Sequence, residues 1–162
     1  MIKVLGLDFA INTQTKIMEN MEIEESAKLT EIKFRLVNPE TPLILVPIYI
    51  NGNGPYEFIL DTGASHSIIS DELAKILNIK GNNTEEAMGW DVHVELISGE
   101  IDSFGIGIAI LEKQEISIGT SEDLENAVGE KINGIVGYDY LKNFIITIDY
   151  PRSIITIGLS PK

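Results

Sequence analysis

The clearest pattern in the chain is a series of short apolar segments separated by turn-forming residues. Residues 43–50 are strongly apolar and rich in β-branched side chains, the turn-forming residues 51–55 follow, and residues 56–60 form a second apolar run. Asn-Gly between two apolar runs is typical of a tight hairpin. The pattern therefore predicts a β-hairpin whose second strand ends at Asp61, far from the hairpin turn.

Several more short strands are expected on either side of this hairpin. Alternation of apolar and charged residues over 29–37 predicts a half-buried strand. Residues 82–107 are expected to form a longer hairpin that turns at Ser98-Gly99-Glu100. The remaining strands are expected over 4–7, 68–69, 115–119, 145–149 and 154–158. Many short strands joined by closely spaced turns predict a mostly-β, barrel-like domain.

Two or three short helices are expected beside the strands. Ser70 can cap a helix over 71–77, whose first turn is acidic. Leu73, Ile76 and Leu77 form one apolar stripe on this helix, which is expected to pack against the core. The other helical segments are expected over 122–125, with Thr120 or Ser121 as the cap, and over 138–144.

The composition narrows the range of partners. The chain has 162 residues, of which 44% are apolar, which is enough for one domain with a real core. It carries 12 basic and 25 acidic residues, for a net charge of −13. Because binding to phosphates needs clustered Lys and Arg, no nucleic acid and no anionic membrane is expected as a partner. The charge mildly favours cationic partners, although an acidic surface alone explains it.

The chain contains no cysteine and two histidines, His66 and His93. A disulfide, a thiolate nucleophile and a Cys-based metal site are therefore excluded, and a His-rich zinc site is not expected. His93 lies in an alternating segment, so an exposed surface position is expected for it. The chain begins with no signal-peptide pattern, and no apolar stretch reaches about 18 residues. A cytoplasmic protein without a membrane segment is the expectation.

A carboxylate that follows directly on an apolar strand is the strongest candidate for chemistry. The predicted hairpin delivers Asp61 to a tight turn made of small and hydroxyl residues, which suits acid–base chemistry. Asp139 and Asp149 are further carboxylates, but one follows a glycine-containing element and the other precedes a turn. Capping or turn roles are therefore expected for these two residues.

The chain resembles the retropepsin-like aspartic proteases, especially the single-domain prokaryotic members related to retroviral proteases. The resemblance covers about residues 42–158. Residues 41–162 are therefore expected to form a protease domain, and residues 1–40 an N-terminal extension packed on the barrel. The matching segments are the first barrel strand and turn at 45–52, the catalytic loop at 60–65, the flap tip at 88–91, the supporting element at 133–137 with Asp139 and Leu141, and the closing strand at 144–151.

The resemblance implies a role for each matching residue. Asp61 would be the catalytic residue, and its loop would be supported by Thr62, Gly63, Ala64 and Ser65. Trp90, the only tryptophan, is open between two interpretations: a side chain that fills the core, or a ligand contact at a mobile flap tip. The flap candidates are Met88, Gly89 and Trp90, and the loop-supporting element is Gly134, Ile135, Val136 and Gly137.

The resemblance also implies a reaction and a partner. Aspartic proteases hydrolyse peptide bonds with two carboxylates that share one proton and activate a water molecule. This chain has one Asp-Thr-Gly sequence, at residues 61–63. The resemblance therefore implies a C2 homodimer in which Asp61 of each subunit lies at the two-fold axis and Thr62 ties the two loops together. A peptide or protein is the implied substrate, and no metal or organic cofactor is needed.

Two other functions compete with this interpretation. The first is a dimerisation or peptide-binding module of retropepsin-like fold with little catalysis, because only Gly89 is available near the proposed flap tip. The second is a phosphatase with an aspartate nucleophile, which would require another Asp two residues after Asp61 and a larger α/β pattern. Position 63 is glycine and the pattern is mostly β, so neither requirement is met.

Overall fold

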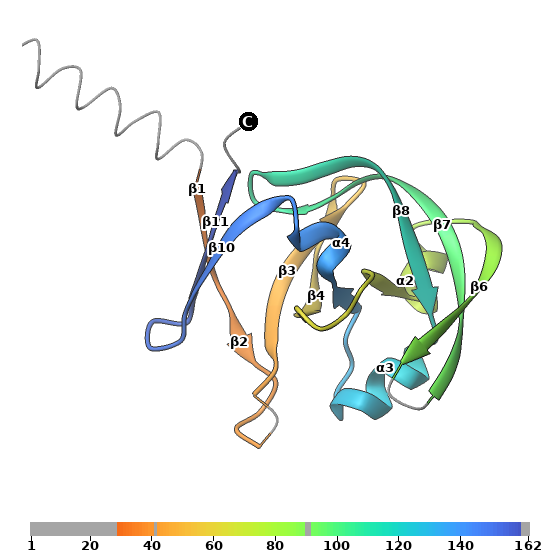
Figure 1. The fold of residues 1–162 in the computed structure, drawn as a ribbon, viewed down its shortest axis with the longest axis horizontal. Coiled ribbons are helices and arrows are strands. Elements are labelled where there is room, and N and C mark those ends of the chain that lie inside the picture. Colours follow the sequence, from red (N-terminus) through yellow and green to blue (C-terminus); the bar gives the residue numbers. More distant parts are fainter. Residues whose placement is uncertain (1–28, 41, 90–91, 160–162) are drawn as a thin grey trace, which may run out of the picture.

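The computed structural model describes residues 29–40, 42–89 and 92–159, which form two β-sheets and three short helices (Figure 1). The strand predicted over 4–7 lies outside the described residues. The described elements are β1 (Leu29–Lys33), β2 (Arg35–Leu36), β3 (Ile44–Ile50), β4 (Asn53–Leu60), β5 (Ile68–Ser70), α2 (Asp71–Ile76), β6 (Gly81–Gly89), β7 (Val92–Ile106), β8 (Ala109–Gly119), α3 (Ser121–Val128), β9 (Gly134–Val136), α4 (Tyr138–Leu141), β10 (Phe144–Asp149) and β11 (Ile154–Leu159).

The larger sheet closes into a barrel. Its strand order is β2-β3-β4-β9-β5-β8-β7-β6, and an additional pairing of β3 with β7 joins the two sides. Tyr49 pairs with Gly105 and Ile50 with Phe104 along this closing seam. The predicted mostly-β barrel with two or three short helices is therefore confirmed, with three helices in the described part of the chain.

The β3–β4 hairpin follows the sequence pattern closely. Asn51 and Gly52 both have positive φ, 50° and 73°, as a two-residue turn of type I′ requires. The turn is shorter than the predicted 51–55, because Asn53 already belongs to β4. The Asn51 side chain also fixes the turn to β7, since its Oδ1 accepts the backbone amides of Asp102 and Ser103 at 2.8 and 3.1 Å.

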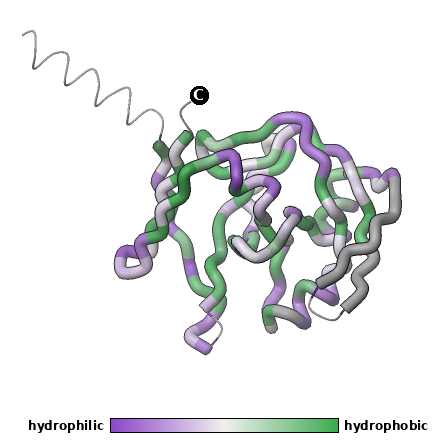
Figure 2. The backbone as a smooth tube through the Cα atoms, viewed as in Figure 1, coloured by the Kyte–Doolittle hydropathy of each residue, from purple (hydrophilic) through white to green (hydrophobic). Residues whose placement is uncertain are grey.

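The smaller sheet has the order β1-β11-β10 and packs on the same core as the barrel. Ile155 and Ile157 of β11 are fully buried, together with Ile48 and Phe58 of the barrel. Figure 2 shows hydrophobic residues along the strands of both sheets and hydrophilic residues at turns such as the one between β10 and β11. The two sheets therefore share one hydrophobic interior.

The single strand predicted over 29–37 is two strands in the structure. β1 pairs with β11 in the smaller sheet, whereas β2 pairs with β3 in the larger one. The break falls at Phe34, which is buried and donates its backbone amide to the Ser153 carbonyl oxygen at 3.0 Å. Leu36 is 38% exposed rather than half-buried, because the chain has passed from the smaller sheet into the larger one at this point. The predicted boundary between residues 40 and 41 stays a prediction.

The turn predicted at Ser98-Gly99-Glu100 is wrong. These residues lie inside β7, where Ser98 pairs with Asn83 on one side and Ser117 on the other. A Cβ atom added to Gly99 would lie 3.0 Å from the Ile79 side chain, so this glycine serves close packing. The chain reverses instead after Ile106, where Gly107 has a φ of 55°.

The predicted helix caps are confirmed, and the predicted apolar stripe is partly wrong. The Ser70 hydroxyl accepts the Leu73 amide at 3.2 Å, and Thr120 rather than Ser121 caps α3. Leu73 is 1% exposed and Leu77 packs half-buried against the core, but Ile76 is 69% exposed and lies outside it. None of the helices described is long and apolar enough to cross a bilayer.

Leu73 and Ile76 give a matched test of this packing. We expect Leu73→Ala to lower the free energy of unfolding by about 2–5 kcal/mol, because it leaves a cavity in the core. Ile76→Ala should change it by less than about 0.5 kcal/mol, because that side chain already faces solvent. Urea unfolding of both variants beside the wild type measures the difference. Equal losses from the two substitutions would contradict the packing described for α2.

Candidate active site

Asp61 lies where the chain crosses over a third strand. β9 lies between β4 and β5, parallel to β4 and antiparallel to β5. The chain leaves β4 at Leu60, passes over the end of β9 through residues 61–67 and returns as β5 on the other side. The Asp61 amide donates to the Val136 carbonyl oxygen at 3.0 Å, which extends the β4–β9 pairing by one residue. The carboxylate is therefore attached to a rigid strand end.

The loop itself orients the Asp61 carboxylate. Oδ1 accepts the backbone amide of Gly63 at 2.8 Å, and the Asp61 carbonyl oxygen accepts the Ala64 amide at 3.3 Å. Asp61 and Ala64 are half-buried, whereas Thr62, Gly63 and Ser65 are exposed. The second oxygen, Oδ2, accepts no hydrogen bond from the described residues. One carboxylate oxygen is thus held in place and the other is free to act on a bound molecule.

The predicted loop-supporting element lies directly beneath the loop. The Ala64 carbonyl oxygen accepts the Tyr138 amide at 2.8 Å. A Cβ atom at Gly137 would lie 2.5 Å from the His66 carbonyl oxygen, and one at Gly134 would lie 2.1 Å from that of Ile68. Only glycine allows these close backbone approaches. The structure therefore brings Gly134, Ile135, Val136 and Gly137 together with the Asp61 loop.

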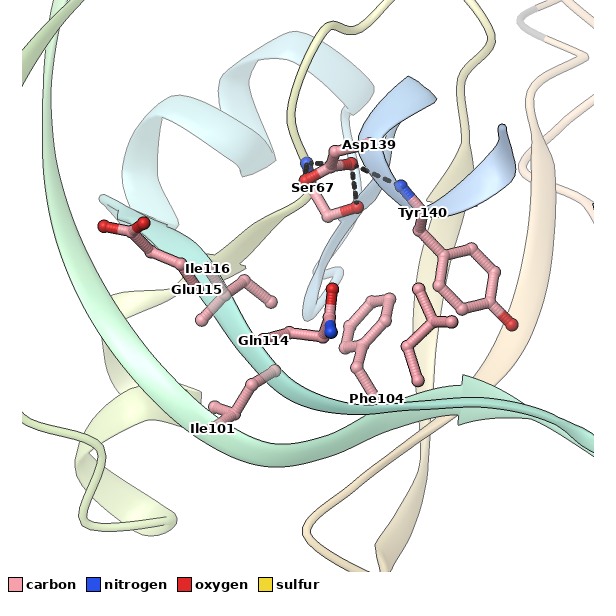
Figure 3. A pocket seen from close by; sticks show the side chains of 9 residues that line it. Ser67, Ile101, Phe104, Gln114, Glu115, Ile116, Asp139 and Tyr140 are labelled. Atoms are coloured by element: carbon pink, nitrogen blue, oxygen red, sulfur yellow. Dashed lines mark hydrogen bonds between the residues drawn. The ribbon is translucent and has the colours of Figure 1, made fainter. Parts of the chain in front are cut away.

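Ser67 and Asp139 form a second anchor that the sequence analysis did not identify (Figure 3). The Asp139 carboxylate accepts the Ser67 backbone amide at 2.9 Å and the Ser67 hydroxyl at 2.7 Å. The same hydroxyl oxygen accepts the Gly137 amide at 3.0 Å, and Ser67 is 4% exposed. This network fixes the C-terminal end of the loop to α4. Nothing in the sequence around Ser67, which precedes Ile68 and Ile69, indicates this role.

The turn role expected for Asp149 is confirmed, whereas Asp139 lies in the first turn of α4 but is not its cap. Asp139 accepts the Tyr140 amide at 2.9 Å at the start of α4, besides holding Ser67. Asp149 accepts the Arg152 amide at 3.0 Å in the β10–β11 turn. This backbone amide, followed by the Arg152 side chain, lowers the pKa of Asp149. Neither carboxylate makes a hydrogen bond to the Asp61 side chain.

A small cavity lies behind the loop, between α4 and the β7–β8 hairpin. Ser67 and Asp139 line one side of it, and Phe104, Gln114 and Glu115 line the other (Figure 3). Tyr140 closes this region: its hydroxyl donates to the Ala109 carbonyl oxygen and accepts the Ile106 amide, and burial raises its pKa. The back of the loop is therefore packed on the barrel.

Within the described residues, no group of three or more His, Asp or Glu is placed to hold a metal ion.

Two of the flap candidates, Met88 and Gly89, lie at the end of β6. Met88 pairs with His93 and Gly89 with Val92, at the ends of the two strands. Trp90 falls outside the described residues, so both interpretations of it stay predictions, as does the exposure expected for the His93 side chain. The two strands pair as a hairpin around this position, since β6 ends directly before residues 90–91 and β7 begins directly after them.

Comparisons with known proteins agree with this geometry. A family model described as aspartyl protease matches residues 46–140, which is more than half of the chain. The crystal structure of a retropepsin-like aspartic protease from Rickettsia conorii has a TM-score of 0.55 and 18% identity, over 81% of this chain and 92% of that one. This likeness shows the fold. A search of curated proteins finds no match.

Two further solved structures are similar at lower scores. One is the retroviral protease-like domain of Ddi1 from Leishmania major, with a TM-score of 0.48 and 18% identity over 74% of this chain and 94% of that one. The other is EIAV protease with an inhibitor, with a TM-score of 0.45 and 17% identity over 65% and 90%. The chain, with its Asp61 loop resting on β9 and α4, belongs to the aspartyl protease family and has the retropepsin-like fold.

Proposed function

We propose that the protein is an aspartic endopeptidase whose active site is completed by a second copy of the chain. The observation that carries the proposal is the position of Asp61: a carboxylate fixed at a strand end, with one oxygen held by Gly63 and the other accepting no hydrogen bond from the described residues. The family match over residues 46–140 supports the reaction class. The single Asp-Thr-Gly sequence supports the need for two chains.

One Asp61 carboxylate alone cannot perform the reaction. Hydrolysis needs one group that removes a proton from the attacking water and another that donates a hydrogen bond to the carbonyl oxygen of the scissile peptide. Two Asp61 carboxylates that face each other across a two-fold axis would share one proton, because two negative charges in close contact repel each other and so cannot both ionise easily. The ionised carboxylate then accepts a proton from water as the water oxygen bonds to the carbonyl carbon, and the protonated one stabilises the charge that develops on the carbonyl oxygen. The C–N bond breaks when a proton from the carboxylate pair reaches the leaving nitrogen.

The remaining site residues are proposed to hold this pair in place. Gly63 orients Oδ1 of Asp61 through its amide, and Ala64 links the loop to α4 through its carbonyl oxygen. Thr62 and Ser65 are exposed on the same loop, where they can contact the partner subunit or a substrate. The hairpin that ends at Met88 and Gly89 is the proposed flap over a bound peptide. No step of this reaction requires a metal or an organic cofactor.

A peptide-binding or dimerisation module is the second candidate function. It is favoured by one observation, the scarcity of glycine near the β6–β7 tip, where Gly89 is the only one within residues 82–98. A module of this kind would need the fold and the dimer but not the carboxylate. Substitution of Asp61 therefore distinguishes the two functions.

We expect Asp61→Asn to abolish peptide cleavage, because an amide of the same shape cannot exchange the proton. The loss in kcat/KM should be at least about 100-fold, while far-UV circular dichroism and the mass in solution stay those of the wild type. Digestion of a peptide library, read by mass spectrometry, measures cleavage. Asp102→Asn, which changes an exposed carboxylate on β7, is the matched control and should cleave normally. Unchanged cleavage by Asp61→Asn would refute the enzyme assignment.

We expect activity to be greatest below neutral pH, because the carboxylate pair must hold one proton. As the pH rises, loss of that proton removes the group that stabilises the carbonyl oxygen, so kcat/KM should fall. The measurement is kcat/KM on one cleaved peptide across the pH range, with the dimer fraction recorded in each sample. A constant kcat/KM from about pH 4 to about pH 9, at constant dimer fraction, would contradict the shared proton.

A further inference from the structure

Arg35 of β2 is the centre of an ion network that joins three segments of the chain. Its guanidinium donates from Nε and Nη2 to the two carboxylate oxygens of Glu57 on β4, at 2.7 and 2.8 Å. Nη2 also donates to Oε1 of Glu130, in the connection between α3 and β9, at 2.9 Å. A single exposed ion pair contributes little, but a two-pronged contact shared with a second carboxylate holds its partners in one geometry. The network therefore fastens the α3–β9 connection to β4.

The two glutamates depend on Arg35 to lie so close together. Oε2 of Glu57 and Oε1 of Glu130 accept hydrogen bonds from the same nitrogen atom of Arg35. The hydrogen bonds to Glu57 and then to Glu130 raise the pKa of Arg35, and the hydrogen bond from Arg35 lowers the pKa of Glu57. Without the guanidinium, two negative charges would face each other and repel. Loss of Arg35 would therefore push the α3–β9 connection away from β4.

This connection is also joined to β4 and β5 through Asn133, the residue directly before β9. The Asn133 amide donates to the Glu57 carbonyl oxygen at 2.9 Å, and its Oδ1 accepts the Glu57 amide at 3.1 Å. Its carbonyl oxygen accepts the Ser70 amide at 2.8 Å. Glu57 is thus bound by Arg35 through its side chain and by Asn133 through its backbone. The first end of β9 is fixed at the residue that Arg35 holds.

The other end of β9 carries the Asp61 loop. The Val136 carbonyl oxygen accepts the Asp61 amide at 3.0 Å. β9 contains only Gly134–Val136, so its two ends are about 10 Å apart. A displacement of the α3–β9 connection would therefore be passed through this short strand to the residue that bears the carboxylate.

The N-terminal extension meets β4 on the face that leads to the carboxylate. Glu57, Ile59 and Asp61 are alternate residues of one extended segment, so they lie on the same face of it. Arg35 contacts the first of them, and Val37 packs against the small hydrophobic cluster that contains Ile59. Both residues of the extension precede residues 46–140, which the family model matches. The extension thus supplies contacts that this part of the chain does not contain.

We propose that Arg35 is a positioning residue of the active site: by holding Glu57 and Glu130 together, it keeps β9 in register beneath the Asp61 loop. Within the described residues Arg35 makes no hydrogen bond to Asp61, so its effect passes through β9. The effect on peptide cleavage rests on the proposed function, whereas the effect on β9 does not. The N-terminal extension is then required for full activity although it lies outside the catalytic loop.

Hydrogen exchange measures the effect on β9 without relying on activity. In the full chain, Arg35→Met should speed exchange of the β9 amides and of the Asp61 amide by at least about tenfold, because the two glutamates then repel each other. Arg152→Met is the matched control, since Arg152 also binds an exposed carboxylate, that of Asp149, but in the β10–β11 turn. It should leave exchange in β9 unchanged. Equal exchange rates in β9 of Arg35→Met and the wild type would overturn the proposal.

Removal of one charge tests whether repulsion is the cause. Glu130→Gln added to Arg35→Met should return exchange in β9 to within about threefold of the wild-type rate, because only one negative charge remains. If the second substitution does not slow exchange, the proposal is overturned. Arg35→Lys keeps the positive charge but not the fork, so exchange should be about threefold faster than in the wild type. If Arg35→Met does not fold, a wild-type rate in Arg35→Lys overturns the proposal in its place.

Steady-state kinetics separate positioning from substrate binding. Arg35→Met should lower kcat by at least about tenfold and change KM by less than about threefold, because a displaced carboxylate slows the reaction of a peptide that is already bound. Arg152→Met should keep the wild-type kcat at the same dimer fraction. A wild-type kcat in Arg35→Met would overturn the proposal and leave the proposed function intact. A wild type that cleaves no peptide would refute the proposed function alone, since exchange in β9 decides the role of Arg35 without activity.

Discussion

The structure depends on the insertion of β9 between β4 and β5. Because β9 occupies the space between two strands that are close in sequence, the chain that joins them must cross its end, and Asp61 lies at the start of that crossing. The crossing is tight: Gly134 and Gly137 approach neighbouring carbonyl oxygens more closely than any side chain would allow. The start of the loop, with Asp61, is therefore set mainly by backbone contacts, and the Ser67 side chain fixes its C-terminal end.

An aromatic series connects this crossing with the rest of the fold. Phe58 of β4 packs edge-on against Phe104 at 5.8 Å, and Phe104 packs against Tyr140 at 5.3 Å. Tyr140 in turn contacts Phe144, the first residue of β10. The strand that carries Asp61, the helix that supports its loop and the start of β10 thus form one packed unit.

The sequence predicted those parts of the fold that local chemistry determines. Asn51 and Gly52 specify their turn because both must adopt positive φ, and Ser70 specifies a helix start because its hydroxyl can accept a free amide. The predictions failed where contacts between segments distant in sequence determine the role of a residue. Gly99 resembles a turn residue, but it lies inside β7, where Ile79 and Ile118 leave little room for a side chain. Ser67 was missed because its role depends on Asp139, which is distant in sequence and adjacent only after folding.

The central claim is that each active site needs two Asp61 residues, and activity in mixed dimers tests it most directly. Wild-type chains and Asp61→Asn chains are mixed at constant total concentration, allowed to exchange subunits, and assayed on one peptide. If both carboxylates are required, activity falls as the square of the wild-type fraction, so an equal mixture retains about a quarter of it. An equal mixture that retains about half would show that one Asp61 is sufficient, and would contradict the account.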